Sequence, residues 1–140
     1  MEADLAWLVH AWIIMPDHVH ILCELGTRLS LGRTVARFKG KSAPCLHAAN
    51  LRWQPGYFEH RLRDPDEIRP TLHYLLMNPV RAQLARHGDL WPGFHCCADD
   101  WAWFKEYADE AVVEPFWLES ADERYFVASK LAPTARNLPP

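Results

Sequence analysis

The chain has 140 residues, a formal net charge of −3 and a hydrophobic content of 49%, which is enough for one folded domain with a buried core. It has no apolar run of about 18 residues, which excludes a membrane-spanning helix, so we expect no membrane partner. The acidic first residues argue against a signal peptide. Four cysteines without paired spacing indicate free thiols in a reducing compartment, so we expect a cytoplasmic protein.

The charge is divided unevenly along the chain. Residues 1–87 carry 11 basic and 8 acidic side chains, whereas residues 88–140 carry 4 basic and 10 acidic ones. Five bases and no acid lie between Arg28 and Lys41. Such a run is most often a solvated helix face, and it indicates a phosphate-binding surface only where it lies beside a functional site.

Two strands are expected near the start of the chain. Residues 5–15 are apolar on both faces, which predicts a buried strand. Pro16 and Asp17 predict a turn. The β-branched run over residues 18–25 predicts a second strand, which Gly26 ends.

A helix and a third strand are expected next. Residues 30–41 predict the helix, with apolar side chains along one stripe and bases on the other side. Pro44 is expected to close it. Alternating side chains over residues 57–62, after a Pro-Gly turn, predict the third strand.

The start of a second helix is marked by three residues. Asp64 is the expected N-cap, Pro65 lies at the first helical position, and Glu67 completes a capping box. The helix is expected to run toward Met77. Pro70 is expected to kink it or to shift its start.

The signals become weaker beyond this helix. Asn78 before Pro79 predicts its end, and residues 80–87 predict a further helical stretch that Gly88 stops. Three tryptophans farther along indicate packing, and residues 134–140 are expected to form a loose tail.

The most informative segment reads Met-Pro-Asp-His-Val-His-Ile-Leu, residues 15–22. On a strand, His18 and His20 leave the same face, while the residues between and after them point the other way, toward a core. Two imidazoles on one face are a candidate pair of metal ligands. An isolated His-x-His is more often structural, so the motif gains weight only from a second constellation.

Tyr74 and Asn78 form that second constellation. They are four residues apart on the expected second helix, so their side chains share a face. Taken alone, a helical tyrosine is usually packing and an asparagine before proline is usually a cap. Together with the histidine pair, the two residues match a known pattern.

The chain resembles the HUH single-tyrosine transposases, and within them the REP-associated tyrosine transposases. The resemblance covers roughly residues 5–90. It rests on motifs in the family's order: Met15-Pro-Asp-His-Val-His-Ile-Leu22, Phe38-Lys-Gly-Lys-Ser42, Trp53-Gln-Pro-Gly-Tyr57, Leu62-Arg-Asp64 and Tyr74-Leu-Leu-Met-Asn-Pro-Val-Arg-Ala82.

The resemblance implies an α/β (α+β) fold, in which helices pack on a small, mainly antiparallel, ferredoxin-like sheet. It implies a transposase core over residues 1–90, and residues 91–140 are then an acidic, tryptophan-containing extension. The chain starts near the family's second strand, so we expect an N-terminally truncated version of the fold. The place of the missing strand would be filled by a second copy in a homodimer, by the C-terminal residues, or not at all.

The resemblance also implies roles for individual residues. Tyr74 takes the place of the nucleophile, His18 and His20 that of the metal pair, and Asn78 that of a third ligand. Family members cut single-stranded DNA beside a hairpin and stay joined to the new 5′ end. The implied activity is therefore that of a metal-dependent single-stranded DNA endonuclease and strand transferase, with hairpin DNA as its partner.

A divalent cation suits this chemistry because it polarises the scissile phosphate. Two imidazoles and an amide oxygen favour Mg²⁺ or Mn²⁺. The acidic C-terminal half weakens long-range attraction to DNA. The candidate contacts to the DNA backbone are Arg33, Arg37, Lys39, Lys41, Arg63 and Arg81.

Four alternatives stay open. A decayed or domesticated relative would bind hairpin DNA without cutting it, and the absence of Tyr74-dependent cleavage would identify it. A cupin would use Glu24 with the two histidines, but the flanking glycines are absent and residues 64–87 have a helical pattern. A histidine-triad hydrolase needs a histidine where Leu22 stands.

The fourth alternative is a structural zinc site in the C-terminal part. Its adjacent cysteines lack the usual Cys-x-x-Cys spacing. The residues available to it are His87, His95, Cys96 and Cys97.

Overall fold

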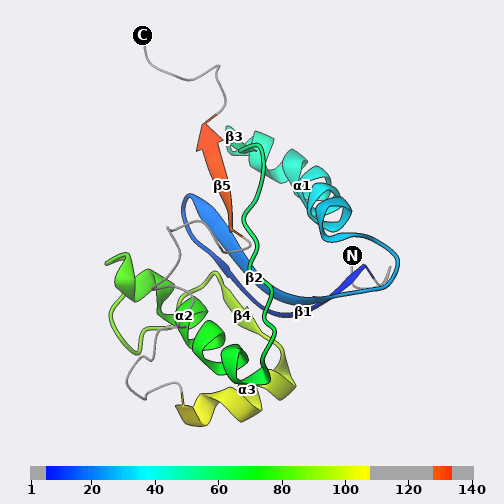
Figure 1. Ribbon diagram of the computed structural model, residues 1–140. Helices are drawn as coiled ribbons and strands as arrows, with labels where there is room; N and C mark the ends of the chain where they lie inside the picture. Colours follow the sequence, from blue (N-terminus) through cyan, green and yellow to red (C-terminus); the bar gives the residue numbers. More distant parts are fainter. Residues whose placement is uncertain (1–5, 108–127, 134–140) are drawn as a thin grey trace.

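The computed structural model describes residues 6–107 and 128–133 (Figure 1). Within these ranges, five strands form one sheet in the order β3-β5-β2-β1-β4, and the paired strands are antiparallel. The strands are β1 (Trp7–Ile14), β2 (His18–Leu25), β3 (Leu51–Trp53), β4 (Phe94–Cys96) and β5 (Ala128–Pro133). The helices are α1 (Leu31–Ala48), α2 (Ile68–Arg81) and α3 (Ala98–Phe104). The expected α+β fold, a small antiparallel sheet with packed helices, is confirmed.

The hairpin of β1 and β2 forms where the apolar runs predict it. At its turn, the Met15 amide donates a hydrogen bond to the His18 carbonyl, with an N···O distance of 2.8 Å. The pairing register shifts between Val9 and Ala11, so His10 is the extra residue of a β-bulge. A bulge re-aims the side chain that it carries.

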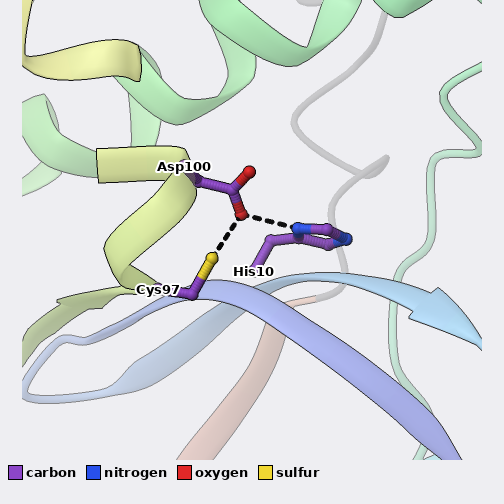
Figure 2. A group of neighbouring side chains, drawn as sticks. All are labelled: His10, Cys97 and Asp100. Atoms are coloured by element: carbon purple, nitrogen blue, oxygen red, sulfur yellow. Dashed lines mark hydrogen bonds and ion pairs between the residues drawn. The ribbon is translucent and has the colours of Figure 1, made fainter. Parts of the chain in front are cut away.

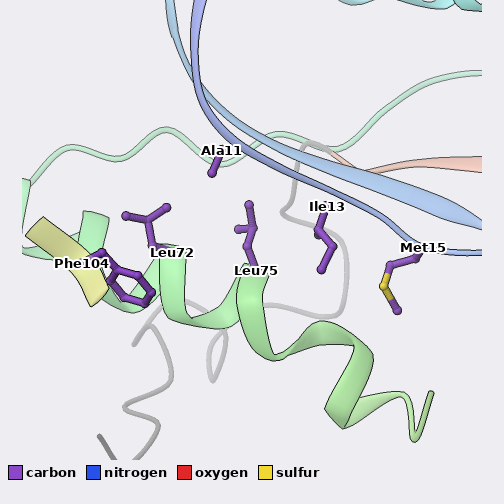
Figure 3. Close-up of a cluster of buried hydrophobic side chains, with 6 residues drawn as sticks. All are labelled: Ala11, Ile13, Met15, Leu72, Leu75 and Phe104. Carbon is purple, nitrogen blue, oxygen red and sulfur yellow. The ribbon is translucent and has the colours of Figure 1, made fainter. Parts of the chain in front are cut away.

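The main hydrophobic core lies between this hairpin and α2 (Figure 3). Its buried members are Ala11, Ile13, Met15, Leu72, Leu75 and Phe104. His20 pairs directly with Ile13 across the ladder, and directly opposed residues share a face. The main core thus lies on the histidine face, which α2 covers, and the sequence did not predict this. The expected burial on the opposite face is also present: Val19 is buried, and Trp7 packs on Phe38 of α1.

Helix α1 lies on the other side of the hairpin (Figure 1) and extends farther than expected, through Pro44. A proline inside a helix costs about 3 kcal/mol. Side-chain contacts with β3 offset this cost: the rings of Phe38 and Trp53 are 5.6 Å apart, and Trp53 Nε1 donates to Ser42 Oγ at 2.9 Å. The predicted end of the helix at Pro44 is therefore wrong.

The prediction of a third strand over residues 57–62 is also wrong. Those residues connect β3 to α2 without joining the sheet, and the third strand is instead β3, which pairs with β5. The Lys39 ammonium donates to the carbonyls of Gln54 and Gly56 at the start of this connection. These bonds hold the start of the connection against α1.

Helix α2 begins with the predicted N-cap. The Asp64 carboxylate accepts a hydrogen bond from the Asp66 amide at 2.9 Å. The first turn, Pro65–Glu67, is a 3-10 turn, and the α-helix proper starts at Ile68. Pro70 therefore lies in the first turn of α2, where its missing N–H is not needed.

Two details of α2 differ from expectation. Glu67 does not complete a capping box: its carboxylate instead contacts the His60 ring at 3.2 Å. The helix also continues through Pro79, whose side chain is fully buried, because packing offsets the lost hydrogen bond. Gln83 then takes a positive φ of 58°, and residues 80–87 form no separate helix.

The C-terminal part joins the same sheet and core. Strand β4 pairs with β1, and β5 pairs with β2 on the side away from β1. Phe104 of α3 is completely buried. The C-terminal residues, which were one of the expected ways to fill the place of the missing strand, thus supply a neighbour for β2. The predicted loose tail, residues 134–140, lies outside the described residues. None of the helices described here has the length and apolarity that crossing a membrane requires.

Gly93 approaches β1 so closely that a side chain does not fit. A Cβ there would lie 2.6 Å from the Ile14 carbonyl oxygen. We expect Gly93→Ala to lower the free energy of unfolding by about 1–3 kcal/mol, the usual cost of overpacking. In Gly40→Ala, the matched control in α1, the new Cβ meets nothing within 4 Å, and stability should rise by up to about 1 kcal/mol. Urea unfolding measures both changes, and an unaltered midpoint for Gly93→Ala would contradict the close approach.

Candidate active site

The two histidines of β2 meet on the face that α2 covers. Their ring centroids are 4.7 Å apart in an edge-to-face arrangement. The His20 ring lies 6.0 Å from the ring of Tyr74, again edge to face. The structure therefore brings both histidines and the predicted nucleophile into one cluster of rings.

The two imidazoles have different environments: His20 is buried, whereas His18 contacts a carboxylate. Burial, reinforced by the neighbouring His18 and only partly opposed by Asp17, lowers the pKa of His20 to about 3. His20 is therefore neutral at physiological pH. The His18 Nδ1 lies 2.6 Å from the Asp17 carboxylate, which fixes the orientation of the ring and leaves Nε2 for another partner.

Helix α2 places two further candidates next to Tyr74. The Asn78 side chain is buried, and its Nδ2 donates to the Tyr74 carbonyl at 3.0 Å. This bond leaves Oδ1 as the amide atom that could coordinate a cation. The Arg81 guanidinium lies 4.9 Å from the centre of the Tyr74 ring.

The donor set fits a divalent cation on chemical grounds. Metal binding requires neutral imidazoles, and His20 is neutral because of its low pKa. A carboxylate behind a ligating histidine is a common arrangement in metal sites, and Asp17 occupies that position behind His18. Asn78 would add an oxygen donor, a ligand type that Mg²⁺ and Mn²⁺ accept.

The basic side chains that were predicted to contact DNA lie in different parts of the fold. Arg33, Arg37 and Lys41 are exposed and lie four residues apart along α1, so they form one stripe. Helix α1, which carries this stripe, lies on the side of the hairpin opposite α2 (Figure 1). The Lys39 ammonium instead donates hydrogen bonds to backbone carbonyls in the connection after β3, and burial lowers the pKa of Lys39. Arg63 is exposed before α2.

The structure also assembles a polar cluster that the sequence analysis missed (Figure 2). One oxygen of Asp100 lies 2.6 Å from both His10 Nδ1 and Cys97 Sγ. The hydrogen bond to Asp100, followed by burial, raises the pKa of Cys97. Burial acts to raise the pKa of Asp100, but the bonds from Cys97 and His10 outweigh it and the net shift is downward.

The structure also bears on two of the alternatives. Among the described residues, the group of His, Cys, Asp and Glu side chains close enough to share an ion is His10, Cys97 and Asp100. The zinc set with His87 is not brought together, and His95 stacks on Trp12 at 4.0 Å. The helix over Ile68–Arg81 argues against a cupin barrel.

Two comparisons with known proteins bear on this site. A family profile described as transposase, IS200 like, matches residues 2–64, which include both histidines and end before α2. The REP-associated tyrosine transposase of Escherichia coli (strain K12) is 26% identical over 94 residues, which cover 66% of this chain and 56% of that protein. A search of the solved structures found no significant match.

The fold and the site define a small α+β domain in which a sheet presents two histidines to a tyrosine-bearing helix. The comparisons support the recognition made from the motifs: over residues 2–64 the chain is similar to the IS200-like transposases, and over 94 residues it is similar to a REP-associated tyrosine transposase. The chain spans little more than half the length of the curated relative that it matches.

Proposed function

We propose that this protein is a transposase-type DNA-processing enzyme that cuts and rejoins single-stranded hairpin DNA through Tyr74. The observation that carries the proposal is the contact between His20 and Tyr74, with ring centroids 6.0 Å apart. In this contact the buried, neutral imidazole of His20 lies beside the ring that carries the proposed nucleophile. The likeness to a REP-associated tyrosine transposase supports this reaction class.

In the proposed reaction, the Tyr74 oxygen attacks a DNA phosphorus and displaces the 3′ oxygen. One P–O bond forms as another breaks, the phenol loses its proton, and the released 3′ oxygen gains one. The product is a 5′-phosphotyrosine and a free 3′-OH. Because the number of phosphoester bonds is unchanged, a 3′-OH can reverse the step and join strands.

A cation would be held by His18, His20 and Asn78. When bound, a divalent ion polarises the phosphate and offsets its negative charge. A tyrosine hydroxyl, whose usual pKa is near 10, needs this help to attack a phosphate at neutral pH. Asp17 would orient His18 through the Nδ1 contact of 2.6 Å. Arg81, above the Tyr74 ring, would hold the phosphate next to the nucleophile.

The remaining basic side chains would hold the DNA strand. Arg63 lies just before α2, and Arg33, Arg37 and Lys41 form the exposed stripe on α1. A strand that reached both groups would have to pass around the edge of the hairpin, since α1 and α2 lie on opposite sides of it (Figure 1). Charge-reversing variants of each group should therefore weaken binding separately, in a salt-dependent way.

The test is incubation of the full chain with end-labelled single-stranded hairpin DNA, with Mn²⁺ or Mg²⁺ and with EDTA. The proposal predicts a shortened labelled strand and a protein-linked strand on a denaturing gel, both absent with EDTA. A duplex of the same sequence should not be cut. Cleavage with EDTA present would contradict the metal-dependent reaction.

The second candidate function is a domesticated relative that binds hairpin DNA without cutting it. The observation that favours it is that the exposed basic stripe belongs to α1, on the side of the hairpin away from α2, so contacts between this stripe and DNA would not involve Tyr74 (Figure 1). It predicts a mobility shift with hairpin DNA, but no cleavage with any divalent cation. The same gel assay therefore separates the two functions.

Metal binding gives a separate prediction. Titration calorimetry with Mn²⁺ should show one binding event that His18→Ala and His20→Ala each abolish, because each removes one of three protein ligands. His47→Ala is the matched control, since His47 is an exposed residue near the end of α1. Equal Mn²⁺ affinity in the His18/His20 double variant would exclude this site.

A further inference from the structure

The polar cluster of His10, Cys97 and Asp100 draws its members from two separate parts of the fold. His10 is the bulged residue of β1, and the other two lie at the start of α3, after β4 (Figure 2). The pairing of β4 with β1 brings them together, and the Cys97 amide donates to the His10 carbonyl at 2.8 Å. All three candidate ligand atoms lie within 4.8 Å of one another.

The donor types indicate which ion the cluster would accept. A thiolate sulfur and an imidazole nitrogen are soft or borderline ligands, which favour Zn²⁺ over Mg²⁺ or Mn²⁺. A carboxylate completes many zinc sites. The cluster thus differs in chemistry from the proposed site of His18, His20 and Asn78, which has nitrogen and oxygen donors only.

The surroundings of His10 match a ligating histidine. Its Nε2 lies 3.1 Å from the Glu24 carboxylate, while Nδ1 points to Asp100. In metal sites, the ring nitrogen that does not bind the ion usually donates to a carboxylate, which fixes the tautomer and the ring orientation. Glu24 on β2 supplies that contact from the opposite side of the ring.

The order of the side chains argues against a cysteine nucleophile. An activated cysteine faces a histidine that takes its proton. Here the thiol of Cys97 faces the Asp100 carboxylate, and the histidine lies on the far side of that carboxylate. The thiol is thus held as a hydrogen-bond donor, and a metal ion is the partner that would convert it into a thiolate.

We propose that His10 Nδ1, Cys97 Sγ and Asp100 form a site for a Zn²⁺-class ion, with Glu24 as the carboxylate that supports His10. Binding displaces the thiol proton of Cys97, and any proton on His10 Nδ1, to solvent. The hydrogen bonds to Asp100, at 2.6 Å each, give way to three bonds to the ion. A fourth position stays open to water. The ion would tie the bulge of β1 to the start of α3.

The test is titration of the full reduced chain with Co²⁺, a spectroscopic substitute for Zn²⁺, in a non-thiol reductant. A thiolate ligand gives a sulfur-to-cobalt charge-transfer band, and tetrahedral geometry gives intense visible bands. We expect both at one equivalent of Co²⁺, and their loss when Zn²⁺ is added. Absence of the charge-transfer band in the folded wild-type chain would overturn the proposal.

Variants identify the ligands. Cys97→Ser and Asp100→Asn should lose the bands or weaken Co²⁺ binding by more than a hundredfold, and Glu24→Gln should weaken it by about 10–100-fold. Cys45→Ser, which changes an exposed cysteine on α1, and the His18/His20 double alanine variant should both keep the sulfur-to-cobalt band and its dependence on Co²⁺ concentration. Circular dichroism checks that each variant folds. If Cys97→Ser fails to fold, Asp100→Asn, which changes one atom, tests the ligand assignment on its own. Bands that survive in Asp100→Asn, or vanish in the double alanine variant, would contradict the assignment.

Discussion

Replacing Tyr74 with phenylalanine is expected to abolish both cleavage of hairpin DNA and the covalent protein–DNA product. The variant keeps the ring that contacts His20 and Arg81, so folding and DNA binding should be almost unchanged. Only the attacking oxygen is lost. The rate should fall to background, a drop of at least about a thousandfold, as when a nucleophile is removed.

A denaturing gel and a mobility-shift assay measure the two effects on the same preparation. Tyr57→Phe is the matched control, because it makes the same change in the connection before α2 and should retain full activity. If Tyr74→Phe still cuts, another group supplies the nucleophile. A metal-bound water would then make the protein an ordinary nuclease.

Replacing Phe104 with alanine is expected to cause the largest loss of stability. The side chain is completely buried in the core with Leu72 and Leu75 of α2 (Figure 3), and its ring lies 6.2 Å from that of His73. Truncation of a buried phenylalanine costs about 3–5 kcal/mol, because it loses apolar burial and leaves a cavity.

Equilibrium unfolding in urea measures this cost. Leu90→Ala is the control, because Leu90 is 89% exposed and its truncation should change stability by no more than about 0.5 kcal/mol. A loss below about 1 kcal/mol for Phe104→Ala would mean that α3 does not pack into the core of the transposase-like domain.

Local sequence signals predicted the elements whose structure depends on neighbouring residues. The apolar runs around Pro16 and Asp17 predicted the hairpin, and β2 has the predicted bounds. Asp64 caps the helix turn as its position indicated. The shared face of His18 and His20 follows from strand alternation alone, and their ring contact agrees with it.

The errors arose where distant contacts outweigh local preference. Helix α1 passes through Pro44 because β3 packs along it, and residues 57–62 stay out of the sheet although their side chains alternate. No local pattern predicts that β5 would pair with β2, or that a bulge would aim His10 at Asp100. The available sequence signal for that cluster was the acidic pair Asp99 and Asp100, which follows Cys97. The histidine that contacts Asp100, His10, lies 90 positions away in the chain.

The roles of Tyr74 and of the cation ligands stay predictions, and one measurement tests the central one most directly. The wild-type chain is incubated with hairpin DNA and Mn²⁺, the denatured product is digested with protease and nuclease, and the modified peptide is sequenced by mass spectrometry. We predict a nucleotide joined through its 5′ phosphate to Tyr74, in the peptide that contains Asn78. A nucleotide on any other residue, or hairpin cleavage without a protein-linked nucleotide, would contradict the account.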